Sequence, residues 1–479
     1  MNTNILWAIF LMGCADEGKG KGDSGDVASG PTFYQNILPV IGENCQGCHN
    51  TDAPMGQAFP LETYSHVAAF AEVLLAKMQP DGDPAGAPFF MPPIYARETA
   101  ECSPLLPWKG AYKASQDEVD LFAAWIDGGK REGDPDSPAG FTRPTVPTLE
   151  GATEQLGFKG SYEVPAPSDG VYDSFRCFAL ETEDGAIEFS DDVWLDGFEF
   201  TPGNDKVVHH VLIYTVNGLD THIAGGLPSD TENNSWDCAG GVSRSDGTYN
   251  VGSINLIYGW VPGSQPLVLQ DGMAMKLSEG TGVVAQIHYN TLSSSSSSAN
   301  RTDSGTLALR ASGTPSREAY IRFVGVASEG ASDQVDDPPF MVPEGEKGHV
   351  ESYTETLPLG LDDRDLRVWG FVPHMHLAGT AIEMSRTRAD GTEDCLFDVP
   401  RWDYNWQQFY VYDGDFSSLP RLAGNDQLKV TCTFDNTDDN PFLQEYLGGA
   451  VEGGVTLGET TEDEMCLVAV GFACEGLCP

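Results

Sequence analysis

Basic residues are scarce in this chain. Only 26 Lys and Arg accompany 72 Asp and Glu, which gives a formal net charge of −46 over 479 residues. A surface this negative repels the phosphates of nucleic acids and anionic lipid headgroups, so we exclude both as specific partners. The composition favours an acidic surface suited to salty surroundings, with an acidic docking face for a basic redox protein as the narrower alternative.

Long apolar segments are also missing. After residue 30 no run is long and apolar enough to cross a bilayer. A short apolar run at 5–12 leads into Leu-Met-Gly-Cys at 11–14, which resembles the lipobox of bacterial lipoproteins. We expect an export signal at 1–14, lipid on Cys14 and a flexible tether at 15–31. No Lys or Arg precedes the apolar run, which leaves a plain secretory signal as the alternative.

The cysteines agree with export. Setting aside Cys14 and the Cys45/Cys48 pair leaves eight, and an even number fits four disulfides in an oxidising compartment, with the pairing open. We therefore predict an exported lipoprotein of a bacterium, periplasmic or on the cell surface, that meets the membrane only through its N-terminal anchor. The eight cysteines are Cys102, Cys177, Cys238, Cys395, Cys432, Cys466, Cys474 and Cys478.

Cys45, Cys48 and His49 form a C-x-x-C-H motif. Two thiols at this spacing can bond to the two vinyl groups of one haem c, and the adjacent imidazole then reaches the iron. A structural zinc site is the alternative, but no second Cys/His pair stands at zinc-finger spacing. The motif predicts a covalently bound haem.

A methionine would be the second iron ligand, and three follow the motif. Met91 is favoured because the prolines after it hold an extended loop that could press the thioether onto the iron. Met78 ends a helical stretch at 64–78 and is interpreted as packing, and Met55 lies very near the attachment site. We predict that Met91 and His49 bind the haem iron.

The helix that closes this domain begins at a capping box of Ser115 and Glu118 and ends at Gly128-Gly129. The stretch from about 33 to 129 resembles a class I cytochrome c, including its terminal Trp-Ile pair. We place the cytochrome c domain at 32–132 and a Pro- and Gly-rich linker at 133–154.

No long helical period follows the linker. Short alternating runs separated by Gly, Asp, Asn and Pro predict strands from about residue 162 onward. The fold expected is therefore multidomain: a small all-α cytochrome c domain, then two all-β domains, antiparallel sandwiches of jelly-roll type, at 155–312 and 313–479. The serine run 293–298 is interpreted as a hairpin loop within the first sandwich, with a domain boundary as the alternative.

Histidine is rare, and five of the nine stand in strand-like contexts: His209-His210, His288, and His374 with His376. Residues i and i+2 of a strand share a face, so the H-x-H pair could share a metal. Adjacent histidines point to opposite faces and could do so only where the strand twists or ends. Ordinary hydrogen-bonded histidines within a sheet are the alternative for each motif taken singly.

The order of these motifs is more specific than any one of them. Lys-Val-Val-His-His (206–210), Gln-Ile-His-Tyr (286–289), His-Met-His-Leu-Ala-Gly (374–379) and Asp-Glu-Met-Cys (463–466) resemble the copper type II, ascorbate-dependent monooxygenases over about 162–472. The resemblance implies two copper ions. His209, His210 and His288 would hold the electron-transfer copper, and His374, His376 and Met465 the oxygen-activating one, where a soft thioether favours Cu(I).

The resemblance also implies disulfides Cys432–Cys466 and Cys177–Cys238. The implied reaction is hydroxylation of a C–H bond with dioxygen and two electrons, the second electron crossing a solvent-filled cleft between the coppers. Here we expect an external donor, a redox protein or small reductant, to pass electrons through the haem to the first copper.

The expected substrate is a small molecule. In the peptide-amidating relatives an Arg two residues before the first His, with an Asn and a Tyr after Met-Cys, bind the peptide carboxylate. Val372, Leu467 and Ala469 stand at those positions here, so a less charged substrate is expected. A non-catalytic copper and haem electron carrier is the alternative function. It would not need the open second site that His374, His376 and Met465 predict.

Overall fold

The structure is a computed structural model. It describes residues 30–479 apart from 48, 52–58, 79–95, 97, 100–101, 110–113, 144–147, 168–171, 240, 252–253, 263, 292–300, 327–339, 359–364, 405–406, 477 and 479. The predicted lipid site Cys14, the predicted haem-binding Cys48 and the candidate ligands Met55 and Met91 therefore lie outside the described residues. Among those described, no helix combines the length and apolarity that a bilayer span needs.

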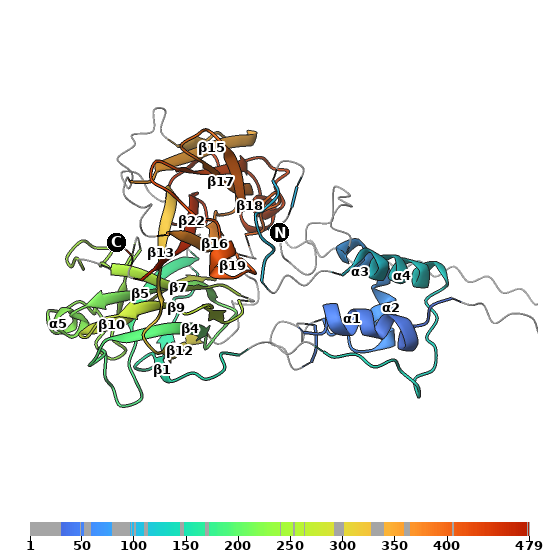
Figure 1. Ribbon diagram of the computed structural model, residues 1–479, viewed down its shortest axis with the longest axis horizontal. Coiled ribbons are helices and arrows are strands. Elements are labelled where there is room, and N and C mark those ends of the chain that lie inside the picture. The colour runs from blue at the N-terminus through green and yellow to red at the C-terminus, as the bar shows by residue number, and fades with distance from the viewer. Residues whose placement is uncertain are drawn as a thin grey trace, which may run out of the picture.

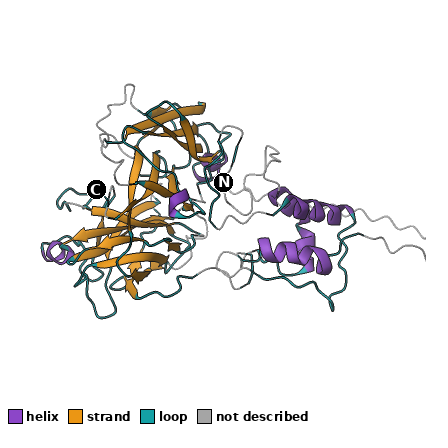
Figure 2. Ribbon diagram, viewed as in Figure 1, coloured by secondary structure: helices purple, strands orange, loops and turns teal. Residues whose placement is uncertain are grey.

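The N-terminal helices form a small module with its own core (Figures 1 and 2). Its elements are a π-helical turn Phe33–Ile37, α1 (Leu38–Asn44), α2 (Tyr64–Ala69), α3 (Ala71–Met78) and α4 (Gln116–Asp127). The capping box predicted at Ser115 and Glu118 is present. The single helix predicted over 64–78 is instead two helices that meet at Phe70.

The described residues 96, 98–99 and 102–109 do not belong to this helical module, although the prediction placed them within its domain at 32–132. Cys102 is disulfide-bonded to Cys395 of the C-terminal strands. Trp108 stacks on Tyr412 at 4.7 Å between ring centroids, and the Lys109 N–H donates to the Val411 carbonyl. We call the described residues of 96–109 the strap. It leaves the module because its buried Trp108 packs in the β core.

The rest of the chain is mostly β, as predicted, in a first half (154–312) and a second half (313–478). The first half contains β1 (Glu154–Gly157), β2 (Tyr162–Glu163), β3 (Asp173–Ala179), β4 (Val193–Thr201), β5 (Val208–Asn217), α5 (Leu219–Ala224), β6 (Ser235–Asp237), β7 (Ile254–Trp260), β8 (Leu267–Val268), β9 (Met273–Leu277), β10 (Thr281–Asn290), β11 (Thr302–Asp303) and β12 (Thr306–Ser312). The second half contains β13 (Arg317–Val326), β14 (Met341–Val342), β15 (Lys347–Thr356), β16 (Arg367–His374), β17 (Gly379–Thr387), β18 (Glu393–Val399), β19 (Tyr410–Val411), a 3-10 turn Phe416–Ser418, β20 (Gln427–Asp435), α6 (Pro441–Tyr446), β21 (Val455–Thr456) and β22 (Cys466–Glu475).

The two halves share one large sheet. Its strand order is β1-β12-β4-β9-β13-β22-β16-β19, and the halves meet where β9 and β13 pair in parallel. A five-stranded sheet, β6-β3-β10-β5-β7, belongs to the first half, and a four-stranded sheet, β15-β20-β17-β18, packs on β13 and β22 in the second. One hydrophobic core runs through both halves. The predicted sandwiches are therefore not separate bodies, because the shared sheet joins them.

The serine run does not divide the halves. It lies outside the described residues, but β10 before it and β12 after it both belong to the first half. The described strands on either side, β10 before the run and β11 and β12 after it, lie in different sheets, so they do not pair as the two arms of the predicted hairpin.

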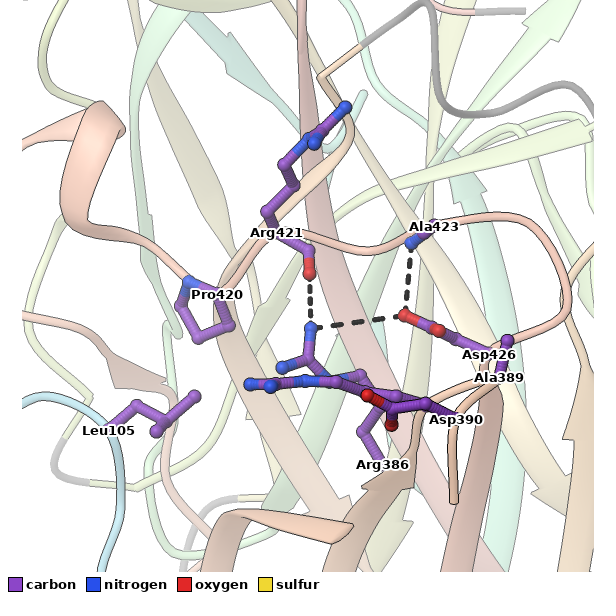
Figure 3. Close-up of a pocket in the computed structure, with 9 residues that line it drawn as sticks. Leu105, Arg386, Ala389, Asp390, Pro420, Arg421, Ala423 and Asp426 are labelled. Atoms are coloured by element: carbon purple, nitrogen blue, oxygen red, sulfur yellow. Dashed lines mark hydrogen bonds and ion pairs between the residues drawn. The ribbon is translucent and has the colours of Figure 1, made fainter. Parts of the chain in front are cut away.

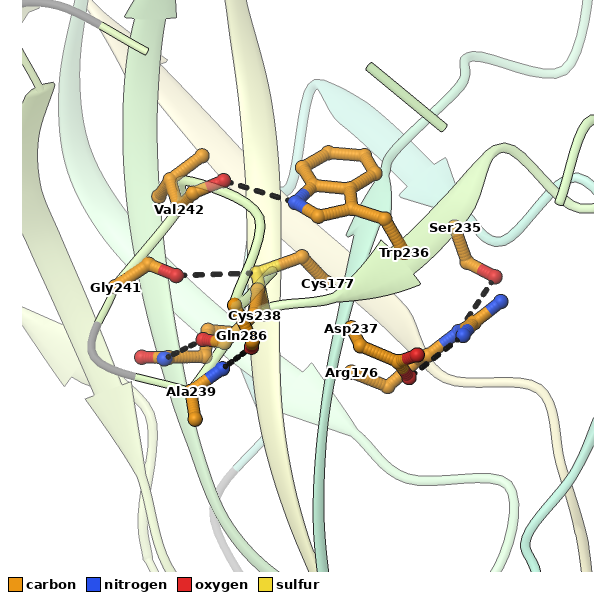
Figure 4. The surroundings of a disulfide bond; sticks show 11 residues. Arg176, Cys177, Ser235, Trp236, Asp237, Cys238, Ala239, Gly241, Val242 and Gln286 are labelled. Atoms are coloured by element: carbon orange, nitrogen blue, oxygen red, sulfur yellow. Dashed lines mark hydrogen bonds and ion pairs between the residues drawn. A yellow bond between two sulfur atoms is a disulfide. The ribbon is translucent and has the colours of Figure 1, made fainter. Parts of the chain in front are cut away.

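All eight remaining cysteines are paired, which confirms four disulfides. Cys177–Cys238 and Cys432–Cys466 form as the family resemblance implied, together with Cys102–Cys395 and Cys474–Cys478. Figure 4 shows the buried Cys177–Cys238 bond, beside which Gln286 donates to the Cys238 carbonyl. Cys432–Cys466 joins β20 to β22, one residue after Met465.

Candidate metal centre

The first three histidines come from two paired strands. His210 on β5 lies opposite His288 on β10, and the register then shifts so that Tyr289 pairs with Val208. This β-bulge leaves His209 without a direct partner on β10, which lets two adjacent histidines turn toward one point. Their ligand-capable atoms and that of His288 all lie within 4.8 Å of one another. In a regular strand His209 and His210 would point to opposite faces, and the bulge is what allows both to face one metal.

His288 is held on two sides. Phe175, its partner on β3, stacks on the imidazole with centroids 4.3 Å apart. Nε2 of His288 lies 2.7 Å from the Asp173 carboxylate, so Nε2 carries the proton and donates it. Nδ1 of His288 is buried and has no hydrogen-bond partner. A buried acceptor of this kind, facing two other imidazoles, fits a metal ligand.

His374 and His376 stand at the end of β16 and in the turn after it. Nδ1 of His374 lies 2.6 Å from the side-chain oxygen of Gln407, and Nδ1 of His376 lies 3.0 Å from the Asp463 carbonyl. Both Nδ1 atoms therefore donate, which leaves both Nε2 atoms as potential ligands. The two rings are 5.0 Å apart between centroids.

The backbone of Met465 is linked to this turn by the buried carboxyl group of Glu464. Glu464 is fully buried and accepts the backbone N–H groups of His376, Ala378, Gly379 and Met465. Burial raises the pKa of Glu464 to about 8, against these hydrogen bonds, which lower it. Glu464 organises the turn around His376, a role that its place in the motif did not reveal.

Burial keeps the imidazoles neutral. It lowers the pKa of His376 to about 3 and that of His374 to about 4, and holds those of His209 and His210 well below 6.5. A neutral imidazole binds a metal without first losing a proton. Copper fits these residue types: three imidazoles at His209, His210 and His288, and two imidazoles with a methionine at His374, His376 and Met465.

The two groups are in contact. The rings of His210 and His374 are 5.3 Å apart between centroids, and Tyr404 of the second half stacks on His209 at 4.5 Å. The rings of His210 and His374 are in contact, so the expected solvent-filled cleft does not separate these two imidazoles in the structure. We call His209, His210 and His288 the first ligand set, and His374, His376 and Met465 the second ligand set.

A cavity of about 220 Å³ borders the first ligand set at the junction. It is lined by residues 205–209, Pro262 and Asn290 from the first half and by Tyr404 and Tyr446 from the second. A larger hollow of about 520 Å³ lies at Arg386, Arg388 and Arg421, away from both ligand sets (Figure 3). Arg386 and Arg388 are ion-paired with Asp394 there, and Arg421 with Asp365.

The positions that would bind a peptide carboxylate are apolar and lie in the sheet. Val372 on β16 pairs with Ala469 on β22, and Leu467 pairs with His374. Leu467 and Ala469 are buried. Neither of them can supply a donor to a carboxylate.

The haem motif is described only in part. Nδ1 of His49 lies 3.1 Å from the Phe59 carbonyl, which leaves Nε2 as the potential iron ligand. Met78 is buried in the core of the helical module, which supports its interpretation as packing.

The comparisons with known proteins address the second half. Residues 335–473 match the family model for the copper type II ascorbate-dependent monooxygenase, C-terminal domain. This segment contains the second ligand set and points to a copper-dependent monooxygenase, with copper-dependent hydroxylation as its general chemistry. No curated protein matches the chain.

Solved structures give little further guidance. Allantoicase aligns at 9% identity over 65% of this chain and 80% of its own, with a TM-score of 0.17. The major capsid protein P2 of bacteriophage PM2 aligns at 9% over 63% and 97%, with a TM-score of 0.22. The subviral-particle VP2 of infectious bursal disease virus aligns at 9% over 68% and 73%, with a TM-score of 0.19. Scores this low carry no argument about this chain.

Proposed function

We propose that this protein is a two-copper monooxygenase that hydroxylates a C–H bond of a small molecule with dioxygen. One observation carries the proposal: the imidazoles of five histidines meet at the junction of the two halves. Bound copper would supply the redox chemistry that dioxygen needs to attack a C–H bond. The residues of the chain would hold the copper ions and orient their imidazole ligands.

The two ligand sets would have different tasks. Three imidazoles, from His209, His210 and His288, suit a copper that exchanges electrons, because nitrogen donors accept both oxidation states. His374 and His376 with the thioether of Met465 suit Cu(I) and leave a coordination position for dioxygen. The contact between the rings of His210 and His374 gives electrons a short path between the sets.

The substrate is proposed to be small and weakly charged. Val372, Leu467 and Ala469 offer no group that binds a carboxylate, which argues against a peptide C-terminus. The cavity of about 220 Å³ borders the first ligand set and includes the charged Asp205 and Lys206, so it is not assigned to a substrate that must reach the second set.

Electrons are proposed to come from an external donor through a haem c on Cys45, Cys48 and His49, with Met91 as the second iron ligand. The His49 hydrogen bond to Phe59 supports this assignment, because it orients Nε2 away from the backbone. The four disulfides support an exported protein, and a lipid on Cys14 would fasten it to the membrane.

The test compares copper content and oxygen uptake under a chemical reductant in the intact protein and in Met465→Leu. The leucine keeps most of the volume and removes the sulfur. We expect two coppers per chain in the intact protein and one in the variant, with oxygen uptake lost. Met384→Leu on β17 is the matched buried control and should keep both coppers and the activity.

Equal copper content and uptake in Met465→Leu would remove Met465 from the site. If the intact protein binds both coppers but turns over no small molecule in a substrate screen, a non-catalytic electron carrier replaces the hydroxylase.

A further inference from the structure

Asp173, the first residue of β3, lies beside the first ligand set without being a predicted ligand. Its side chain is 9% exposed. One oxygen accepts from Nε2 of His288 at 2.7 Å, from the side chain of Asn290 at 2.8 Å and from the hydroxyl of Thr461 at 2.7 Å. The other accepts the backbone N–H of Thr461 at 3.1 Å. A buried carboxylate with four donors is a fixed part of the structure.

The donors come from both halves. His288 and Asn290 are two residues apart on β10 and pair with Phe175 and Asp173 on β3, so all four side chains share one face of the sheet. Thr461 belongs to the second half and is 1% exposed. Half of the carboxylate's hydrogen bonds therefore depend on contact between the halves.

Thr461 also begins the loop that builds the second ligand set. Asp463, two residues on, orients His376, and Glu464 holds the turn around His376 and Met465. The Thr461 hydroxyl further lies 3.3 Å from that of Tyr404, whose ring stacks on His209. A single buried threonine thus contacts the supports of both sets.

We propose that Asp173 and Thr461 are a pair of positioning residues that couples the two ligand sets. By accepting the Nε2–H of His288, the Asp173 carboxylate makes the other ring nitrogen, Nδ1, a stronger metal ligand. The same carboxylate fixes the 459–465 loop that carries Met465. Metal at the first set therefore orders the loop, and the ordered loop in turn strengthens metal binding at the first set, because such coupling is reciprocal. This inference rests on the proposed assignment of His288 as a copper ligand.

A neighbouring contact provides the control. The Tyr172 hydroxyl donates a hydrogen bond to Glu462 at 3.5 Å. This bond also joins the two halves, but neither residue belongs to a ligand set. If Asp173 and Thr461 only held the halves together, Tyr172→Phe would behave like Thr461→Val. Coupling instead requires that the two variants differ.

The test uses the full chain and copper alone, without substrate. Copper affinity of the first set is measured by chelator competition, and its geometry by the Cu(II) electron paramagnetic resonance spectrum. Hydrogen exchange of the 459–465 peptide is measured before and after one equivalent of copper. We expect Asp173→Asn to weaken first-set affinity by about 10–100-fold. Thr461→Val removes the hydroxyl that hydrogen-bonds to Asp173, Asn290 and Tyr404 and should weaken it by roughly fivefold.

One equivalent of copper should slow exchange of the 459–465 peptide in the intact protein and in Tyr172→Phe, and not in Thr461→Val. An unchanged affinity and spectrum in Asp173→Asn would overturn the positioning role. Equal behaviour of Thr461→Val and Tyr172→Phe would overturn the coupling. None of these measurements needs turnover. If Asp173 and Thr461 prove to be coupled but the protein shows no oxygenase activity, the proposed function is rejected and this inference stands.

Discussion

The two ligand sets are built by different means. His210 and His288 face each other on paired strands, and the backbone ladder, a bulge and the stacked Phe175 set their positions. His376 and Met465 lie in a turn and a loop, where Glu464 accepts four backbone N–H groups in place of a strand partner. The first set therefore takes its geometry from the sheet, and the second depends on one buried side chain.

Removing the Glu464 carboxyl should give the largest effect. Glu464→Gln replaces one of its two acceptor oxygens with an amide group, which leaves buried N–H donors unpaired. We expect a loss of roughly 4 kcal/mol in the free energy of unfolding, loss of copper from the second set and weaker copper binding at the first, measured by denaturant unfolding and metal analysis. Glu355→Gln, which loses a surface ion pair with Arg322, should change none of these. Retention of both coppers at unchanged stability would contradict this account.

The neutral imidazoles of the junction should make the metal-free protein sensitive to acid. Burial lowers the pKa of His376 from its ordinary 6.5 to about 3. Between pH 6.5 and about pH 3, His376 is protonated in the unfolded chain but not in the folded one. The free energy of unfolding therefore decreases as pH falls below 6.5. Between pH 7 and pH 5 this one residue should cost about 2 kcal/mol.

Thermal unfolding of the metal-free protein at these two pH values measures the effect. His376→Gln should flatten the dependence, whereas His66→Gln, at an exposed position in α2, should leave it as it is. A dependence that is the same in all three proteins would show that His376 is not the source.

The smallest effect expected is on the first ligand set. Phe175→Leu removes the ring stacked on His288 but leaves the Asp173 hydrogen bond and the strand ladder. We expect a few-fold loss of copper affinity at the first set, about 1 kcal/mol, with the second set unchanged. Phe178→Leu, three residues along β3 and stacked on Phe158, is the matched control and should lower stability without changing copper affinity. A complete loss of first-set copper in Phe175→Leu would show that the sheet alone does not hold His288.

Local patterns in the sequence were sufficient for part of this molecule. Ser115 and Glu118 predicted the start of α4, because a capping box involves only neighbouring residues. The even count of cysteines predicted four disulfides, and the resemblance identified two of the pairs correctly. The H-x-H spacing and the paired histidines marked the candidate ligands, although His376 lies in the turn after β16 and a β-bulge, not a regular strand, brings His209 and His210 together.

Contacts between distant segments could not be predicted in this way. The strap lies within the predicted helical domain, yet Cys102 and Trp108 pack on strands about 300 residues later in the chain. Asp173 and Thr461 carry no motif, and nothing in their local sequence indicates that they meet at His288.

By itself, then, the sequence indicated candidate metal ligands and a mostly β fold, because both depend on residue type and local spacing. Only the tertiary structure decided that the two ligand sets touch, that Glu464 supports the second of them, and that Asp173 joins both. These depend on how the halves pack across the shared sheet, and packing between residues far apart in the chain is not encoded in any short stretch of it.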